Sequence, residues 1–261
     1  MEPTIQLKTN VSSGHIFRAG SILLTGGSGK LGGRILDLKG LKNGFLTPTR
    51  KEMDITEMDS VRRFFSRNDF SIVIHCAAMA RMGECEKSPG EAVLTNVVGT
   101  ANIARAAIEN GSRLVYISTD GVYSGKKGNY SEGDETIPYN TYGWTKLGGE
   151  TAAKAVKNHC IIRTSFFDPE KIHFETAAED MYSSKMEIGK LAMEIVRMAQ
   201  SKFIGTVNIG EGREAEFERY RRYKPGIRKC KFEDIQNGLD FGVAKDSSMD
   251  CSLWRRLNEK N

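Results

Sequence analysis

Residues 21–38 read SILLTGGSGKLGGRILDL and contain an apolar run, a glycine-rich turn and the start of an amphipathic helix. Gly26, Gly29 and Gly32 follow the run in a G-x-x-G-x-x-G pattern. Glycine suits such a turn because it adopts backbone angles that other residues resist, and because a Cβ atom would keep a phosphate away from the helix amides. The amino terminus of the following helix supplies free N–H groups and a partial positive charge. The segment therefore predicts a strand, a phosphate-binding turn and a helix, in that order.

Apolar runs of the same kind recur along the chain, with helical patterns between them. Each run is short and rich in branched or aromatic residues, which is typical of a strand buried on both faces. The further predicted strands cover residues 44–47, 71–76, 113–118, 159–163 and 206–209, and the clearest helices cover residues 91–110 and 141–158. Such alternation predicts right-handed β-α-β crossovers. We therefore expect an α/β fold with a Rossmann-type, doubly wound parallel sheet.

The alternation weakens from about residue 165 onward, which divides the chain into three expected parts. Residues 1–20 precede the first strand and form an N-terminal arm, either a floppy segment or an added edge hairpin. Residues 21–164 form the dinucleotide-binding core, and residues 165–261 supply the last sheet elements and a small, shortened substrate lobe. A chain of 261 residues has room for one large α/β domain of this kind.

The composition excludes several classes of protein. With 39% hydrophobic and 27% charged residues, the chain resembles an ordinary globular protein rather than a disordered or fibrous one. No apolar run approaches the roughly 18 to 20 residues that span a bilayer, and the first residues lack the layout of a secretion signal. The five cysteines include no C-x-x-C pair, and the four histidines show no metal-binding spacing. We expect a cytoplasmic protein without a metal site, and the net charge of +5 does not by itself identify a partner.

The residues after the second predicted strand bear on the choice of cofactor. A dinucleotide-binding protein that prefers NAD(H) usually has an acidic residue there, which accepts a hydrogen bond from the ribose 2′-hydroxyl. Here Pro48, Thr49, Arg50 and Lys51 follow the strand. A guanidinium can bind a 2′-phosphate through two hydrogen bonds, so Arg50 favours NADP(H), with NAD(H) as the alternative. The competing interpretation of Arg50 is a solvated surface charge.

A second group of residues suggests acid–base chemistry. Tyr142 and Lys146 lie one helical turn apart on the same face of the helix predicted at 141–158. A phenol normally titrates near pH ~10, and a neighbouring cation can favour its phenolate. Thr119 and Asp120 follow the strand predicted at 113–118, and the carboxyl ends of the strands face the ligand crevice. We therefore expect the Thr119 and Tyr142 hydroxyls to meet over one substrate carbonyl.

The chain resembles the extended short-chain dehydrogenase/reductase family, and within it the dTDP-4-dehydrorhamnose reductase branch. The matching segments, in chain order, are TGGSGKLG, RKEMDIT, IVIHCAA, TNVVGTANIARA, LVYISTDGVYSG, PYNTYGWTKLGGE, IIRTSFF and DSSMDCS. The resemblance implies reduction of a nucleotide-linked keto sugar by hydride from a nicotinamide. It implies that Thr119 is the catalytic hydroxyl, Tyr142 the general acid and Lys146 the assisting lysine.

The resemblance also implies which residues hold the cofactor. Asp54 and Ile55 would flank the adenine, Cys76, Ala77 and Ala78 would line the channel, and Asn96 would support the site from the next helix. The full set of expected cofactor residues is Gly26, Ser28, Gly29, Lys30, Leu31, Arg50, Asp54, Ile55, Cys76, Ala77, Ala78, Asn96, Tyr142 and Lys146. The expected substrate contacts are Met79, Arg81, Thr119 and Asp120.

Two departures from the branch leave the substrate open. Residues 79–86 read MARMGECE, without the tyrosine and threonine that relatives tend to carry there, although Arg81 could bind an anionic group if it is not a solvated loop charge. Residues 165–190 are also shorter than in full-length relatives. The alternatives are therefore an epimerase or dehydratase of the same family, or an NADP(H)-binding regulatory subunit, as in a relative that regulates methionine adenosyltransferase.

The remaining expectations concern partners. Residues 219–224 read RYRRYK and follow several glutamates, which favours a mixed-charge solvated helix over a nucleic-acid contact. A contact to a substrate diphosphate is the other interpretation. The resemblance suggests a homodimer through the helices at 91–110 and 141–158. We expect a small-molecule substrate, with no nucleic acid and no membrane.

Overall fold

A computed structural model describes residues 22–38 and 44–259, so the predicted arm at 1–20 lies outside the described residues. Six parallel strands form the central sheet in the order β10-β5-β4-β3-β1-β2. Their bounds are β1 Ile22–Thr25, β2 Phe45–Leu46, β3 Ile72–His75, β4 Arg113–Ile117, β5 His159–Thr164 and β10 Gly205–Ile209. All six predicted strands are confirmed, and so is the doubly wound α/β fold.

The strand order creates a crevice at one edge of the sheet. The chain passes from β1 to β2 on one side and then crosses to β3 on the other side of β1. The loops after β1 and β3 therefore diverge at the carboxyl ends of two adjacent strands. In doubly wound sheets ligands bind at this point.

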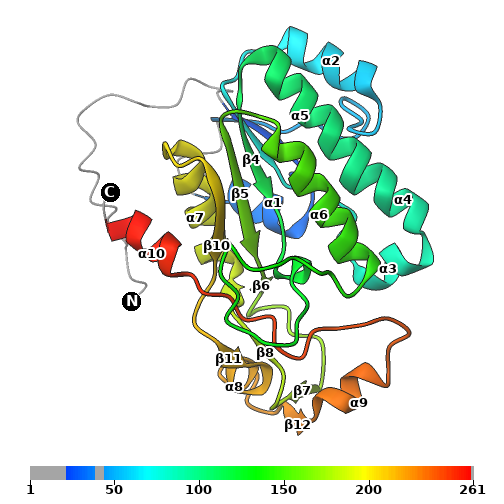
Figure 1. Ribbon diagram of the computed structural model, residues 1–261, viewed down its shortest axis with the longest axis vertical. Helices are drawn as coiled ribbons and strands as arrows, with labels where there is room; N and C mark the ends of the chain where they lie inside the picture. Colours follow the sequence, from blue (N-terminus) through cyan, green and yellow to red (C-terminus); the bar gives the residue numbers. More distant parts are fainter. Residues whose placement is uncertain (1–21, 39–43, 260–261) are drawn as a thin grey trace.

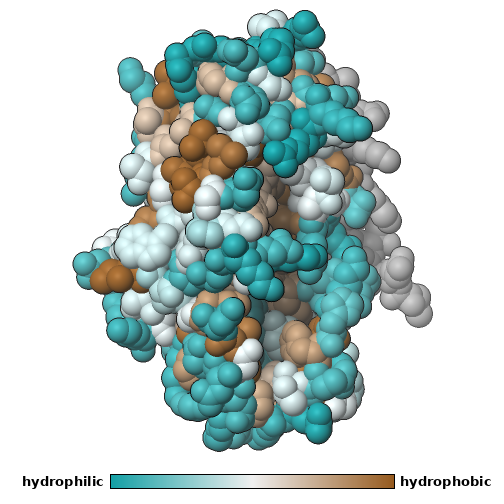
Figure 2. Space-filling model, turned by 90° about the vertical axis from the view of Figure 1, so that its right-hand side faces the viewer, coloured by the Kyte–Doolittle hydropathy of each residue, from teal (hydrophilic) through white to brown (hydrophobic). Residues whose placement is uncertain are grey.

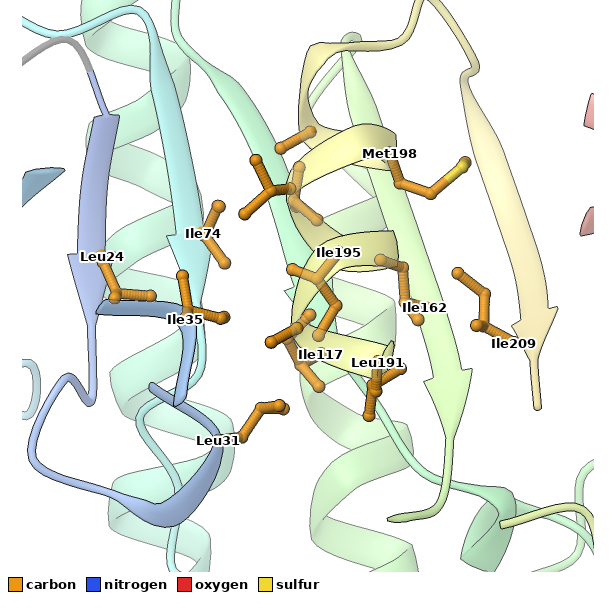
Figure 3. Packing of buried hydrophobic residues seen from close by; sticks show 14 of the residues in the cluster. Leu24, Leu31, Ile35, Ile74, Ile117, Ile162, Leu191, Ile195, Met198 and Ile209 are labelled. Carbon is orange, nitrogen blue, oxygen red and sulfur yellow. The ribbon is translucent and has the colours of Figure 1, made fainter. Parts of the chain in front are cut away.

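The sheet is buried on both faces, which explains why its strands are short apolar runs. In β1, Ile22 and Leu24 belong to one hydrophobic cluster and Leu23 belongs to the other. Because successive side chains of a strand point to opposite faces, a strand between two cores needs apolar residues at consecutive positions. Figure 3 shows the first cluster, in which Leu31 and Ile35 of α1 and Leu191 and Ile195 of α7 pack against the same face of the sheet.

Helices cover the two faces in separate groups. α1 and α7 pack on the first cluster, and α2, α5 and α6 pack on the second (Figure 1). The bounds are α1 Lys30–Leu36, α2 Met58–Arg67, α3 Met82–Lys87, α4 Pro89–Val93, α5 Gly99–Asn110, α6 Thr141–Lys154 and α7 Ile188–Gln200. No helix within residues 22–38 and 44–259 is both long and apolar enough to cross a membrane.

The helix predicted at 91–110 contains an irregular turn. It begins at Pro89, passes through a π-helical segment, η2 (Leu94–Val98), and ends before Gly111, which adopts the left-handed conformation. A π turn shifts the side chains that follow it and frequently marks a functional site. The sequence pattern predicted a regular helix because periodicity alone does not reveal one extra residue in a turn.

Residues after β5 contribute α7 and β10 to the sheet layer and form a smaller lobe at the bottom of Figure 1. Three two-stranded sheets, β11-β8, β12-β7 and β6-β9, organise this part. The bounds are β6 Phe166–Phe167, β7 Thr176–Ala178, β8 Tyr182–Ser183, β9 Met186–Glu187, β11 Glu214–Ala215, α8 Glu216–Arg221, β12 Arg228–Cys230, α9 Phe232–Gln236 and α10 Ser252–Glu259, with the 3-10 turn η3 at Asp120–Val122. The chain then returns from the lobe to the sheet, where α10 lies beside α7 and β10.

Candidate active site

The glycine turn after β1 lies against the end of β3. Gly26 has a φ of +73°, and a Cβ atom added there would lie 2.6 Å from the backbone nitrogen of Ala77. A Cβ atom on Gly32 would overlap the carbonyl oxygen of Gly26. Both positions therefore require glycine, one for its conformation and its space and the other for its space alone. The turn leads directly into α1, as the sequence predicted.

A cavity of about 530 Å³ opens at this turn, between the carboxyl ends of β1, β2 and β3. Nine expected cofactor residues line it, namely Gly26, Ser28, Gly29, Arg50, Asp54, Ile55, Cys76, Ala77 and Ala78. Seven more residues line it that were not among the expected cofactor residues, namely Thr25, Thr47, Pro48, Thr49, Met53, Thr56 and Thr95. Thr47 and Pro48 could have been found from their position after the second strand, by the rule that identified Arg50.

Arg50 has a carboxylate partner that the sequence analysis did not anticipate. Its Nε atom donates to Oδ2 of Asp54 at 2.9 Å, while its side chain is 77% exposed. Oδ1 of Asp54 accepts from the amide and the hydroxyl of Thr56. The hydrogen bonds from Thr56 and Arg50 together hold the pKa of Asp54 below its ordinary value, although burial opposes them. The guanidinium thus lies at the cavity rim, and Asp54 orients it.

Other expected cofactor residues lie outside the cavity wall. Lys30 is exposed at the start of α1, and Leu31 is buried in the first hydrophobic cluster. Asn96 is fully buried in η2, where its side-chain oxygen accepts from the amide of Met79 at 2.8 Å. Its amide nitrogen donates to the Met79 carbonyl and to the Thr145 hydroxyl. Asn96 therefore supports neighbouring segments rather than presenting a surface to a ligand.

The helix that carries Tyr142 and Lys146 is held at its first turn by two side chains. Asn140 caps α6 by accepting from the amide of Gly143 at 2.9 Å. Glu86 of α3 accepts from the amide and the hydroxyl of Thr141, each at 2.7 Å. A carboxylate at a helix amino terminus satisfies free N–H groups and is favoured by the helix dipole. The sequence analysis missed Glu86 because its partner lies 55 residues further along the chain.

Lys146 is 3% exposed, and its Nζ atom lies 4.1 Å from the centroid of the Tyr116 ring. Burial lowers the pKa of Lys146 to about 7, against smaller opposing contributions from Cys76 and Glu150. Lys146 lies close enough to Cys76, which lines the cavity, for the two side chains to interact through charge. A lysine here can carry or lose its proton near neutral pH.

The acidity of Tyr142 differs from the expectation. Burial raises the pKa of Tyr142, and the main opposing contribution is a hydrogen bond with Thr119. Lys146 was expected to stabilise the phenolate, but its ammonium is itself penalised by burial and lies over Tyr116. Tyr142 is therefore held as a neutral phenol, which is the form that can donate a proton. The structure does bring Thr119 and Tyr142 together.

Thr119 and Asp120 form a buried pair at the end of β4. The Thr119 hydroxyl accepts from the amide of Gly121 and donates to Oδ1 of Asp120, both at 3.1 Å. Oδ2 of Asp120 accepts from the Ser247 hydroxyl at 2.7 Å. Burial raises the pKa of Asp120. Asp120 therefore holds the hydrogen of Thr119 and joins β4 to the tail of the chain.

The two remaining expected substrate residues, Met79 and Arg81, differ in burial. Met79 is partly buried, and its backbone is held on both sides by Asn96. Arg81 precedes α3, has an 80% exposed side chain and pairs with Glu84 at 2.9 Å. The structure thus places Met79 beside the supporting framework and Arg81 toward solvent.

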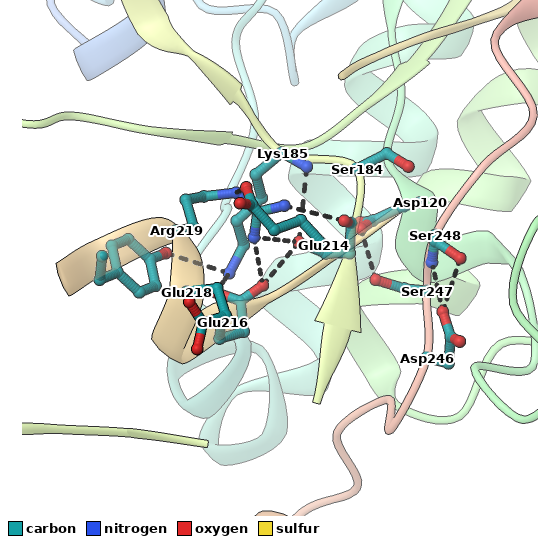
Figure 4. A network of polar contacts seen from close by, with 12 residues as sticks. Asp120, Ser184, Lys185, Glu214, Glu216, Glu218, Arg219, Asp246, Ser247 and Ser248 are labelled. Carbon is teal, nitrogen blue, oxygen red and sulfur yellow. Dashed lines mark hydrogen bonds and ion pairs between the residues drawn. The ribbon is translucent and has the colours of Figure 1, made fainter. Parts of the chain in front are cut away.

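The helix expected to be solvated, residues 219–224, is partly buried. Arg219 is 0% exposed and donates to Glu216 and to the hydroxyl and carbonyl oxygens of Ser183. Glu216 also pairs with Lys185 at 2.7 Å, and Figure 4 shows this cluster near Asp120 and Ser247. The expectation was wrong for Arg219 because its partners in β8 could not be located from local charge pattern. Arg221 and Arg222 do lie at the surface, where they pair with Glu218 and Glu214.

Comparison with known proteins agrees with this geometry. The RmlD substrate binding domain family matches residues 20–186. The chain is 38% identical over 149 residues to a dTDP-4-dehydrorhamnose reductase of Mycolicibacterium smegmatis, a match that covers 56% of this chain and 45% of that protein. The chain spans about half the length of the curated relatives it matches.

Solved structures extend the likeness to the whole fold. A crystal structure of a hypothetical dTDP-4-dehydrorhamnose reductase from Sulfolobus tokodaii has a TM-score of 0.82 and 27% identity, covering 90% of this chain and 94% of that one. The dTDP-4-dehydrorhamnose reductase of Bacillus anthracis, solved in complex with NADP, has a TM-score of 0.82 and 24% identity, covering 92% and 93%. Since the family match spans more than half of its residues, the chain belongs to the RmlD substrate binding domain family.

Proposed function

We propose that the chain is an NADP(H)-dependent oxidoreductase that reduces the keto group of a nucleotide-linked sugar. The observation that carries this proposal is a single edge of the sheet that holds both the glycine-lined cavity and the Thr119, Tyr142 and Lys146 group. The names of the Mycolicibacterium and Bacillus proteins support the substrate class, and the NADP in the Bacillus complex supports the cofactor.

The cavity residues fit a dinucleotide. The turn at Gly26 has no room for a side chain, and Gly32 lets α1 start against it, so backbone amides can approach a pyrophosphate. Arg50 at the rim would hold the 2′-phosphate of NADP(H), and NAD(H) is the alternative cofactor. Asp54 and Ile55 would flank the adenine, while Cys76, Ala77 and Ala78 would line the channel toward Lys146.

Bound NADPH supplies a hydride to the keto carbon. We assign the remaining steps to this chain's own side chains. Tyr142 would donate its phenol proton to the keto oxygen as the C=O double bond becomes a C–OH group, and Thr119 would donate to the same oxygen by turning its hydroxyl hydrogen away from Asp120. General acid catalysis of this kind typically contributes about 10²- to 10⁴-fold. Lys146 would bind the cofactor ribose.

The proposal also includes a substrate lobe and a homodimer surface. Residues 165–261 would form the reduced substrate lobe, with Met79, Arg81, Thr119 and Asp120 on the substrate side. A homodimer would use the surface where Val93, Leu94, Val98 and Trp144 are exposed on α4, η2 and α6. Figure 2 views the molecule from this side and shows an apolar patch among hydrophilic surface.

The test is consumption of NADPH by the full chain with a panel of nucleotide-linked 4-keto sugars, followed by the nicotinamide absorbance. We expect turnover with at least one sugar and a hydroxyl product at the former keto carbon. Tight NADPH binding without consumption for every sugar would contradict the proposal and would fit the regulatory alternative.

A further inference from the structure

His75, the last residue of β3, is a fully buried histidine between the cavity and the helix that carries Tyr142. Its Nδ1 atom lies 2.6 Å from the hydroxyl oxygen of Thr25, and its Nε2 atom lies 3.1 Å from the hydroxyl oxygen of Thr100. Thr25 ends β1 immediately before the glycine turn, and Thr100 lies in α5. One imidazole thus joins two separate parts of the site.

The contacts of the two threonines define which ring nitrogen carries the proton. The Thr100 hydroxyl donates its single hydrogen to the backbone carbonyl of Asn96 at 2.7 Å, so toward His75 it can only accept. Nε2 must therefore carry a hydrogen. In the neutral ring Nδ1 is then an acceptor, and it accepts from the Thr25 hydroxyl. Burial, together with the charge of Lys146, lowers the pKa of His75 to about 3, which keeps the ring neutral.

On the cavity side, the contact organises the wall. The Thr25 hydroxyl donates its hydrogen to His75, and its oxygen accepts from the amide of Ala77 at 3.2 Å. Ala77 lines the cavity and lies against Gly26. The two hydrogen bonds of the Thr25 hydroxyl therefore tie His75 to the spacing between the glycine turn and the segment after β3.

On the other side, the hydrogen bonds continue to the catalytic helix. Thr100 holds the Asn96 carbonyl, and the Asn96 side chain donates to the Thr145 hydroxyl at 2.9 Å. The Thr145 hydroxyl in turn donates to the backbone carbonyl of Tyr142 at 2.9 Å. The Thr100 hydroxyl has one hydrogen, which the Asn96 carbonyl takes, so an imidazole with its hydrogen on Nδ1 would leave Nε2 without a donor at Thr100.

We propose that His75 is a positioning residue whose neutral, Nε2-protonated ring couples the dinucleotide cavity to the placement of Tyr142. The effect of His75 on Tyr142, and so on turnover, rests on the proposed reductase function. The effect of His75 on the cavity concerns only the affinity for NADPH.

NMR of the imidazole nitrogens in the full chain tests the tautomer, with the His75 signals identified by their loss in His75→Gln. We expect a hydrogen on Nε2, none on Nδ1, and no titration between about pH 5 and 8. A hydrogen on Nδ1, or a ring that titrates in this range, would overturn the proposal. The tautomer is read from the unsubstituted protein, and the variant serves only to assign the signals.

Two conservative variants test the coupling by separating its halves. His75→Asn keeps an acceptor near the Nδ1 position but loses the reach to Thr100, so we expect a kcat about tenfold lower and a nearly unchanged Kd for NADPH. His75→Gln keeps an N–H near the Nε2 position but loses the acceptor for Thr25, so we expect a Kd about tenfold higher and a smaller change in kcat. His159→Asn and His159→Gln are the controls, since His159 starts β5 at the opposite edge of the sheet and contacts the Val156 carbonyl.

Equal losses of kcat and affinity in both His75 variants, or no loss in either, would overturn the coupling and leave His75 as a packing residue. If the unsubstituted chain turns over no sugar, the proposed function fails. The tautomer of His75 and the NADPH affinities of the two variants then still test whether His75 organises the dinucleotide cavity.

Discussion

The Nζ atom of Lys146 lies 4.1 Å above the ring of Tyr116, where the ammonium faces an aromatic surface instead of water. The aromatic face attracts a cation, but it replaces only part of the lost hydration. Burial accordingly lowers the pKa of Lys146 from 10.5 to about 7. The free energy of unfolding should therefore depend on pH through Lys146.

We predict that Lys146→Met is more stable than the unsubstituted chain at pH 7 and that the difference narrows at higher pH. Between pH 7 and about 10.5 the unfolded chain holds the Lys146 proton and the folded chain has lost it, so raising the pH favours folding. The slope of the difference is at most about 1.4 kcal/mol per pH unit. Urea unfolding of both proteins measures it. Lys154→Met, on the exposed last turn of the same helix, is the control. A difference that does not vary with pH would contradict the lowered pKa.

Two adjacent glycines of α1 should respond in opposite ways to alanine. Gly32→Ala places a methyl group on the Gly26 carbonyl, so we expect loss of stability and NADPH affinity weakened by at least about tenfold. At Gly33 the nearest atom to an added Cβ is the Gly27 carbonyl oxygen at 3.7 Å, which is an ordinary contact. Gly33→Ala should therefore gain up to about 1 kcal/mol from helix propensity and keep its affinity. Thermal unfolding and NADPH titration compare them, and equal behaviour would argue against close packing at Gly32.

Arg50 should decide between the two nicotinamide cofactors. Arg50→Ala is expected to raise the Kd for NADPH about tenfold to a hundredfold and to leave the Kd for NADH nearly unchanged, because a charge-assisted bond to the 2′-phosphate is lost. Lys51→Ala, which removes the neighbouring exposed charge, serves as the control. Titrations with both cofactors measure the preference. Comparable or tighter binding of NADH by the unsubstituted chain would contradict the assignment.

Glu86 should stabilise the start of the catalytic helix. Glu86→Ala removes both acceptors of Thr141, so we expect a loss of about 1 kcal/mol in the free energy of unfolding. We also expect a lower kcat, since Tyr142 follows Thr141 directly. Glu84→Ala tests the same helix at an exposed ion pair with Arg81, where the expected change is close to zero. Similar losses in the two variants would show that α3 as a whole, and not the contact to Thr141, is responsible.

The parts of the fold that depend on local pattern could be predicted from the sequence. Consecutive apolar residues such as Leu23 and Leu24 indicate a strand between two cores, and Gly26 after such a run indicates a turn that binds phosphate. The direction in which the Asn96 amide points could not be predicted, because the π turn at Leu94–Val98 sets it. The burial of Arg219 likewise depends on Ser183, which comes close only after β8 and α8 have folded together.

The same distinction applies to the candidate site. Position after a strand identified Thr119 and Arg50, since the carboxyl ends of parallel strands share one edge. Hydrogen bonds between distant segments could not be predicted from the sequence. Examples are the bond from Ser247 to Asp120 and the bond from Thr141 to Glu86. The pKa of Tyr142 was expected to follow its nearest cation in the sequence, but burial outweighs that charge. Desolvation depends on the whole packed structure, which a four-residue spacing does not describe.

The most direct test of the account compares NADPH binding and NADPH oxidation in Tyr142→Phe. The variant keeps the ring and removes only the hydroxyl that would donate the proton, so we predict an unchanged Kd for NADPH and a kcat lowered by about 10²-fold or more with the best keto-sugar substrate. Tyr139→Phe, which removes the hydroxyl of a partly buried tyrosine three residues earlier, should keep kcat within about tenfold of the unsubstituted chain. Retention of turnover in Tyr142→Phe would contradict the account.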